Sequence, residues 1–119
     1  MGGVVRDCPN FFTIYGPASN VAHGGSALFI AECQTHFILR CLQMMFARGW
    51  RQIEIERRAH DEYNVAVQTE LSHYLWTHPA MNSWYKNSRG KVTTNLPWRL
   101  VDYWQRSRDP VPSRFIGRA

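Results

Sequence analysis

The segment from residue 26 to residue 48 constrains the fold most, because it is long, largely apolar and free of glycine and proline. Of the 20 positions from Ala27 to Phe46, 14 are apolar. The polar residues spaced by three or four positions form one narrow stripe: Glu32, His36, Arg40 and Gln43. This spacing predicts a continuous helix with one hydrated stripe, and Gly49 is suited to end it.

A helix of this composition requires packed neighbours on most of its surface. We expect five side chains spread along it to face such neighbours: Phe29, Cys33, Phe37, Leu42 and Met45. The rest of the 119-residue chain offers little to cover the helix. Part of its apolar surface should therefore be exposed, as a patch of roughly several hundred Å² that is typical of a binding surface. Glu32 and Arg40, in the middle of the helix, argue against a membrane span.

The residues before this helix predict a strand, a turn and a helix start. Phe11 to Tyr15 is an aromatic and β-branched run typical of a buried strand, and Gly16-Pro17 ends it. A polar connector leads to Gly24-Gly25-Ser26, which opens the helix. The free N–H groups of a helix start attract anions, and glycine allows another molecule close to the backbone. The segment is therefore a candidate cofactor contact, although an ordinary strand–loop–helix connection has the same pattern.

The rest of the chain predicts short elements. Residues 51–57 alternate polar and apolar side chains, which predicts a half-exposed strand. Residues 59–76 carry one apolar face and predict an amphipathic helix. We expect a hairpin over residues 83–94 and a short helix over residues 97–106. Residues 109–119 contain two prolines and predict a loose end.

Composition and cysteine usage limit the class of protein. A hydrophobic fraction of 45% excludes a disordered chain, and 119 residues suit one small domain or a piece of a larger one. The three cysteines are an odd number without a C-x-x-C motif, which argues against a disulfide framework and favours a reducing, cytoplasmic environment. The first residues lack the basic start and apolar run of a signal peptide.

The positive charge is concentrated at one end of the chain. From Lys86 onward there are eight basic and two acidic residues, a net charge of +6, which leaves −1 for the first 85 residues. A basic arm of this kind can bind nucleic acid or an acidic partner surface. The chain could therefore be a small stand-alone interaction module. No DNA- or RNA-binding motif accompanies the arm, so a solvated arm is the simpler interpretation.

Residues with catalytic or metal-binding chemistry are sparse. Cys33 and His36 lie three apart on one helical face, with His23 upstream, but a catalytic zinc site needs three well-placed ligands. Cys33 is more simply a small buried residue, so the sequence predicts neither a metal site nor a catalytic residue. Four tryptophans near basic residues could stack on bases or pack a core, and core packing is the commoner role: Trp76, Trp84, Trp98 and Trp104. No G-x-G-x-x-G or P-loop motif is present.

Short pieces of the chain, taken in order, carry a family resemblance. The first are Pro9-Asn10-Phe11-Phe12, Tyr15-Gly16-Pro17, Asn20, His23-Gly24-Gly25-Ser26 and Glu32-Cys33-Gln34. The others are Arg48-Gly49, Ile53-Glu54, Ala59-His60-Asp61, Tyr63-Asn64, Asn82-Ser83-Trp84-Tyr85, Gly90-Lys91-Val92-Thr93-Thr94-Asn95 and Pro97-Trp98. The ordered set resembles the C-terminal region of flavin-containing, Baeyer–Villiger-type monooxygenases, and is most similar to the 4-hydroxyacetophenone monooxygenase-like branch.

This resemblance implies an α/β fragment of three parts. Residues 1–50 would be the last strand and long helix of a Rossmann-type FAD-binding domain. Residues 51–108 would be a cap with a short strand, an amphipathic helix and a hairpin, and residues 109–119 a loose basic tail. The implied activity is FAD- and NADPH-dependent oxygenation, either insertion of oxygen into a small ketone or oxygenation of a heteroatom.

The resemblance also implies cofactor contacts. The turn at Gly16, Pro17 and Asn20 and the helix start at Gly24, Gly25 and Ser26 would lie beside the flavin ring. Trp84 would lie near the nicotinamide cofactor, although a hairpin tryptophan that fills the core is an equal alternative.

The glycine-rich FAD and NADPH fingerprints of the family would lie before the matched region, and eight residues are too few to hold them. We therefore expect a partner, the missing N-terminal FAD- and NADPH-binding portion. We expect this chain alone to have no monooxygenase activity and to bind no FAD.

Overall fold

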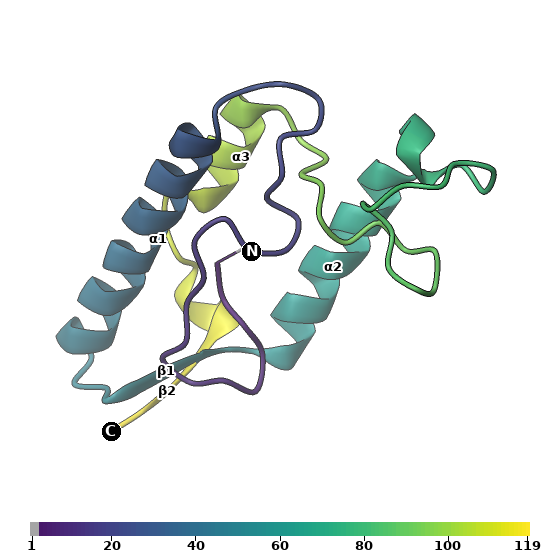
Figure 1. Ribbon diagram of the computed structural model, residues 1–119. Helices are drawn as coiled ribbons and strands as arrows, with labels where there is room; N and C mark the ends of the chain where they lie inside the picture. Colours follow the sequence, from purple (N-terminus) through teal and green to yellow (C-terminus); the bar gives the residue numbers. More distant parts are fainter. Residues whose placement is uncertain (1–2) are drawn as a thin grey trace.

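The computed structural model describes residues 3–119. The elements follow in the order α1 (Ala27–Ala47), β1 (Gln52–Ile55), α2 (Arg57–Leu71), a 3₁₀ turn (Leu75–Thr77), α3 (Leu100–Ser107), a second 3₁₀ turn (Pro112–Arg114) and β2 (Phe115–Arg118). Figure 1 shows α1 and α3 together on one side and α2 on the other, with irregular segments between them and the β1–β2 pair below. The chain is therefore a small α/β unit in which loops fill the space between the helices.

Helix α1 is continuous, as the sequence predicted. Its first turn is capped by Ser26, whose hydroxyl accepts a hydrogen bond from the backbone N–H of Phe29 at 3.2 Å. It ends where Gly49 adopts a left-handed φ of +65°, a conformation that glycine adopts without steric cost. No helix within residues 3–119 is both long enough and apolar enough to cross a membrane.

Helix α1 contributes to two separate cores. Its N-terminal half packs with α2, α3 and the segment before α3, in a cluster of Ile30, Cys33, Val67, Leu71, Val92, Leu96, Trp98 and Tyr103. Its C-terminal half packs against both strands, in a cluster of Phe37, Cys41, Met45, Ile53, Ile55, Ala59 and Phe115. Phe29 and Leu42 pack at the edges of these clusters, so all five expected side chains face neighbours.

The opposite side of α1 is uncovered. Leu28 and Phe46 are 76% and 71% exposed, and Leu39 between them is also exposed. Their spacing of eleven and seven residues places them along one line of a helix with 3.6 residues per turn. A row of exposed large apolar side chains is unusual on a solvated helix and typical of a contact surface.

The predicted strand at Phe11 to Tyr15 is wrong. Only an isolated antiparallel bridge between Val4 and Phe12 forms there, and Phe11 and Ile14 are each 55% exposed. Tyr15 has a φ of +55°, which no strand contains. The run pairs with neither β1 nor β2, the two strands of the sheet within residues 3–119, so strand propensity alone does not produce a strand.

The predicted loose tail is also wrong. Strand β2 pairs antiparallel with β1, with Phe115 opposite Ile55 and Gly117 opposite Ile53. Phe115 is buried and its ring centroid lies 6.3 Å from that of Phe37 on α1. The strand predicted over residues 51–57 is shorter in the structure, where β1 covers Gln52–Ile55. The backbone N–H and C=O groups along one edge of β1 require hydrogen-bond partners, and the C-terminal strand β2 supplies them.

The remaining elements agree with the predictions in kind and differ in their ends. Helix α2 begins two residues early because the Glu56 carboxylate accepts a hydrogen bond from the Ala59 N–H at 2.9 Å. It ends five residues early, at Leu71. The hairpin has a single bridge, between Lys86 and Val92. Helix α3 begins at Leu100 rather than Pro97, because Pro97 is buried in the segment before it.

The pairing of the C-terminus predicts that Phe115→Ala destabilises the chain by about 3 kcal/mol, as expected when a buried aromatic ring is removed. Ile116→Ala is the matched control, because Ile116 is exposed on the same strand; it should cost less than about 0.5 kcal/mol. Urea unfolding monitored by circular dichroism measures both changes. Equal effects of the two substitutions would show that β2 does not pack as described.

Candidate functional site

Four of the seven predicted contact residues line one cleft. Gly16, Pro17 and Asn20 come from the segment before α1, and Trp84 comes from the hairpin region more than 60 positions later. Tyr15, Thr93 and Thr94 complete the lining, and the cleft volume is about 350 Å³. The structure therefore brings together residues that the sequence separates widely.

Backbone hydrogen bonds join the two walls of this cleft. The N–H of Ala18 donates to Thr93 O and the N–H of Asn20 to Thr94 O, both at 2.9 Å. The N–H of Leu96 donates to Asn20 O at 2.8 Å, so the two segments form an isolated parallel bridge between Asn20 and Asn95. The Asn20 side chain adds a bond from its Nδ2 to Asn95 Oδ1 at 2.9 Å. These bonds fix the turn at Gly16-Pro17 relative to the hairpin region.

Gln34 holds the same turn onto the helices. Its side chain is buried on α1, where its amide nitrogen donates to Ser19 Oγ at 2.8 Å and to Tyr103 Oη at 2.9 Å. Its amide oxygen accepts the backbone N–H of Tyr15. One side chain thereby joins α1, α3 and both sides of the turn. The sequence did not predict this role. The one signal for it is that Gln34 is a polar residue of the helix outside the hydrated stripe.

Trp84 projects from the cleft wall and does not fill the core. It is 73% exposed, and its ring centroid lies 4.6 Å from that of Tyr85. The alternative of a core-filling hairpin tryptophan is therefore wrong. An exposed indole presents a large apolar face and an N–H donor, which suits contact with another molecule.

The helix start is a separate surface. Gly24, Gly25 and Ser26 precede α1 and do not line the cleft. Gly24 has a φ of +97°, and a side chain there would meet nothing within 4 Å. Gly25 differs, because a Cβ would lie 2.9 Å from the Leu100 side chain. Gly24 therefore leaves the backbone open to an approaching molecule, whereas Gly25 allows α1 and α3 to pack closely.

The cleft lining is uncharged and mostly apolar. Its polar groups are hydroxyl, amide and indole groups, and none of its seven lining residues is an acid, a lysine, an arginine or a histidine. Asn95, which lies behind Asn20, is buried, and its Nδ2 has no partner within the described residues. This chemistry fits hydroxyl-bearing or ring-edge parts of a cofactor. It does not fit a pyrophosphate, which requires cations or a glycine-rich helix start.

The two buried cysteines, Cys33 and Cys41, are poorly suited to nucleophilic chemistry. Burial raises the pKa of Cys33, and it raises the pKa of Cys41 to about 12, so both thiols remain protonated at neutral pH. His36 is exposed beside buried Cys33. No group of three or more potential metal ligands occurs among residues 3–119.

The basic residues near the C-terminus are partly engaged within the chain. Arg99 pairs with Asp102 at 2.7 Å, and the guanidinium groups of Arg106 and Arg108 lie over the rings of Trp98 and Trp104. Arg118 lies on β2. The charge predicted for a free arm is therefore distributed over folded elements.

The role of Gln34 predicts that Gln34→Leu destabilises the chain by about 2–3 kcal/mol, because three polar groups lose their partner in a buried place. Gln43→Leu is the matched control, since Gln43 is exposed on the same helix; its effect should be below about 0.5 kcal/mol. Urea unfolding gives both values. Amide exchange at Tyr15 should also accelerate in Gln34→Leu, and unchanged exchange would contradict the role of this side chain in holding the turn.

We expect the chain to lose stability at alkaline pH because the hydroxyl group of Tyr103 is buried. Burial raises its pKa to about 12, partly opposed by the bond from Gln34, whereas an unfolded tyrosine titrates near 10. The free energy of unfolding should be retained below pH 10 and should fall by about 2–3 kcal/mol as the pH rises from 10 to 12. Urea titrations of wild type and Tyr103→Phe should differ over this range. A parallel decline in the two proteins would assign the effect to other groups.

Similarity to known proteins supports one family. No family model matches the chain. An uncharacterized monooxygenase of Sinorhizobium fredii is 38% identical over 104 residues, which are 87% of this chain and 16% of that protein. An FAD-binding monooxygenase of Aspergillus niger is 31% identical over 106 residues, 86% of this chain and 17% of its own length. A Baeyer-Villiger monooxygenase of Streptomyces coelicolor is 26% identical over 108 residues, 90% and 21% of the two chains.

A solved structure has the same fold. The oxidized steroid monooxygenase bound to NADP superposes with a TM-score of 0.81 and 20% identity, over 98% of this chain and 22% of that one. The chain thus spans only about a sixth to a fifth of the length of the relatives that it matches. Together with the residues that carry the resemblance, these similarities show that the chain belongs to the flavin-dependent monooxygenases and corresponds to one part of such an enzyme.

Proposed function

We propose that this chain is the C-terminal, cofactor-facing part of an FAD- and NADPH-dependent monooxygenase that oxygenates ketones or heteroatoms. Helix α1 would belong to the Rossmann-type FAD-binding domain, and the remaining elements would form the cap. The relatives are several times longer than this chain, so the complete activity requires a separate portion that carries the glycine-rich fingerprints. That portion is the proposed partner.

The cleft with an exposed tryptophan carries this proposal. Gly16, Pro17, Asn20 and Trp84 were expected at the cofactors on the basis of the resemblance, and they line one cavity. A glycine and a proline at the turn leave the backbone accessible, and Trp84 presents an indole N–H beside it. In the proposed role this N–H donates to a ribose hydroxyl of NADPH while the ring packs against the cofactor.

The open helix start supports a flavin contact. A Cβ at Gly24 would have no atom within 4 Å. The N-terminal end of α1, which carries a partial positive charge, follows directly. A helix N-terminus favours the negative charge that develops on the pyrimidine edge of a flavin during reduction. Gly24 and Ser26 would therefore hold and orient the ring, whereas Gly25 would act through helix packing.

The exposed row on α1 supports the proposed partner. Leu28, Leu39 and Phe46 lie along the uncovered side of the helix. Covering them would remove apolar surface from water at about 25 cal/mol per Å².

The cofactor supplies the oxygen-transfer chemistry when it is bound. The residues of this chain bind and orient it: Trp84 and Asn20 through polar contacts, and the turn at Gly16-Pro17 through its shape. No residue of the chain is assigned a role as acid, base or nucleophile, and the buried thiols of Cys33 and Cys41 are protonated at neutral pH.

Trp84→Phe tests this function in the complex of this chain with the FAD- and NADPH-binding portion. The substitution keeps the ring and removes the N–H donor, so we expect KM for NADPH to rise about fivefold with unchanged kcat, as for the loss of one uniform contact of about 1 kcal/mol. Steady-state oxidation of NADPH with an aryl ketone measures both constants.

Trp104→Phe is the matched control, because Trp104 is a part-exposed tryptophan on α3 outside the cleft. It should leave KM for NADPH unchanged. The isolated chain should retain no FAD through gel filtration, because a few backbone hydrogen bonds of about 1 kcal/mol each cannot supply the roughly 8 kcal/mol of micromolar binding. An unchanged KM in Trp84→Phe, or FAD bound by the chain alone, would contradict the proposal.

A further inference from the structure

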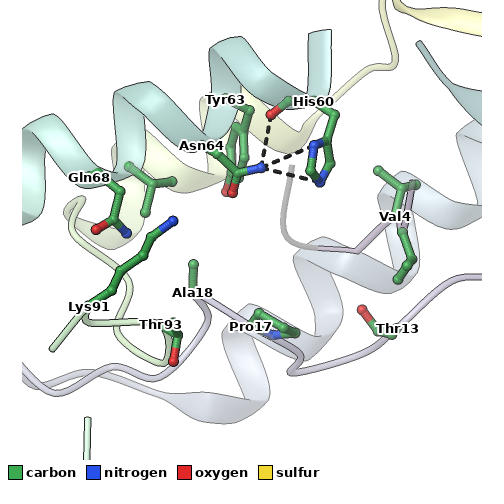
Figure 2. Close-up of a pocket in the computed structure, with 12 residues that line it drawn as sticks. Val4, Thr13, Pro17, Ala18, His60, Tyr63, Asn64, Gln68, Lys91 and Thr93 are labelled. Atoms are coloured by element: carbon green, nitrogen blue, oxygen red, sulfur yellow. Dashed lines mark hydrogen bonds between the residues drawn. The ribbon is translucent and has the colours of Figure 1, made fainter. Parts of the chain in front are cut away.

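A second pocket lies on the other side of the segment that forms the cleft wall. It is open to solvent, its volume is about 220 Å³, and none of its twelve lining residues is acidic. Figure 2 shows it between α2 and the segments around Pro17 and Thr93, which also line the cleft. At about 30 Å³ per water molecule, the pocket holds roughly seven waters, which is enough space for a small organic molecule.

The walls of this pocket are fixed by hydrogen bonds. Gln68 on α2 donates from its Nε2 to Val92 O at 3.0 Å, which joins α2 to the segment that carries Lys91 and Thr93. Thr93 O accepts the N–H of Ala18, and Gly3 O accepts the N–H of Thr13, both at 2.9 Å. The pocket is therefore a formed concavity that three separate segments build, as ligand sites usually are.

The polar groups of the pocket favour an anion. Lys91 has no ion pair or hydrogen bond from its ammonium group within the described residues. Figure 2 shows this ammonium directed toward α2, with His60 at the far end of the pocket. Asp61 on α2 does not line the pocket, and its carboxylate contacts the Arg6 guanidinium at 3.3 Å and the His60 ring at 3.2 Å. An unpaired cation in a pocket without carboxylates attracts negative charge.

The rest of the lining favours an apolar body. Five small apolar residues form the floor and sides: Val4, Val5, Pro17, Ala18 and Val67. The Asn64 amide nitrogen is already engaged by the His60 ring at 3.2 Å and by His60 O at 3.1 Å. Both ring nitrogens of His60 are likewise engaged, Nδ1 by Asp61 Oδ1 and Nε2 by the Asn64 amide, each at 3.2 Å. The donors that remain for a ligand are the Lys91 ammonium and the Thr93 hydroxyl.

We propose that this pocket binds a small organic carboxylate, with its carboxylate group at Lys91 and Thr93 and its apolar body against Val67 and Ala18. This site is distinct from the cofactor cleft and shares with it the wall at Pro17 and Thr93. Ligand binding at this second pocket does not depend on the proposed monooxygenase function.

Benzoate and its neutral isostere benzamide test the proposal on the 119-residue chain. Two-dimensional ¹H–¹⁵N spectra at constant ionic strength should show saturable benzoate shifts at Asn64, Val67 and Thr93, with a dissociation constant on the order of 1 mM. Benzamide should bind about fivefold more weakly, because it lacks the charge that Lys91 attracts.

Lys91→Met keeps the side-chain length and should weaken benzoate binding about fivefold while leaving benzamide unchanged. Lys91→Arg should retain benzoate binding. Arg89→Met is the matched control, because it removes one positive charge from the same turn outside the pocket. Equal affinity for benzoate and benzamide, an effect of Arg89→Met as large as that of Lys91→Met, or no saturable shift at these residues would each overturn the proposal.

Discussion

The buried amide of Gln34 is the interaction on which the arrangement of this chain depends. An amide inside an apolar helix face costs free energy unless its donors and acceptor find partners. Here the partners come from Tyr15, Ser19 and Tyr103, three positions that belong to the turn before α1 and to α3. Satisfying one side chain therefore fixes the turn at residues 15–20 against the helices. The left-handed backbone at Tyr15 and Ala18 is compatible with this arrangement and incompatible with a strand.

The segment from Lys91 to Leu96 divides two sites of different character. On one side, its carbonyl groups at Thr93 and Thr94 accept hydrogen bonds from the turn, and the resulting cleft is uncharged. On the other side, Lys91 and Thr93 face α2 across a pocket that contains a cation and no carboxylate. An uncharged cleft suits hydroxyl and ring-edge contacts, whereas the second pocket suits a carboxylate. The same backbone hydrogen bonds join the wall that both sites share.

The long helix α1 is shared between two small hydrophobic clusters and leaves one of its sides uncovered, as the proposed partner requires. A single helix serves both hydrophobic clusters, so each cluster is small. The Cα atoms extend only 18 Å along the shortest axis, less than two helix diameters of about 10–12 Å. No layer of the described residues covers the row of Leu28, Leu39 and Phe46. A partner that packs on this row would complete the core in the manner of a layered α/β domain.

The sequence by itself determined the elements whose signals are local. The 3.6-residue periodicity, the Ser26 cap and Gly49 defined α1, and the ordered short pieces identified the family and the residues of the cleft. Tertiary structure decided what depends on distant partners. Phe11 to Tyr15 has strand propensity but pairs with no strand of the sheet, whereas the C-terminus lacks that pattern and becomes β2 by pairing with β1. Gly117 is required there because a Cβ would lie 1.8 Å from the Trp50 ring. Likewise, exposure of Trp84 and burial of Gln34 follow from packing between segments, which the order of residues along the chain does not encode locally.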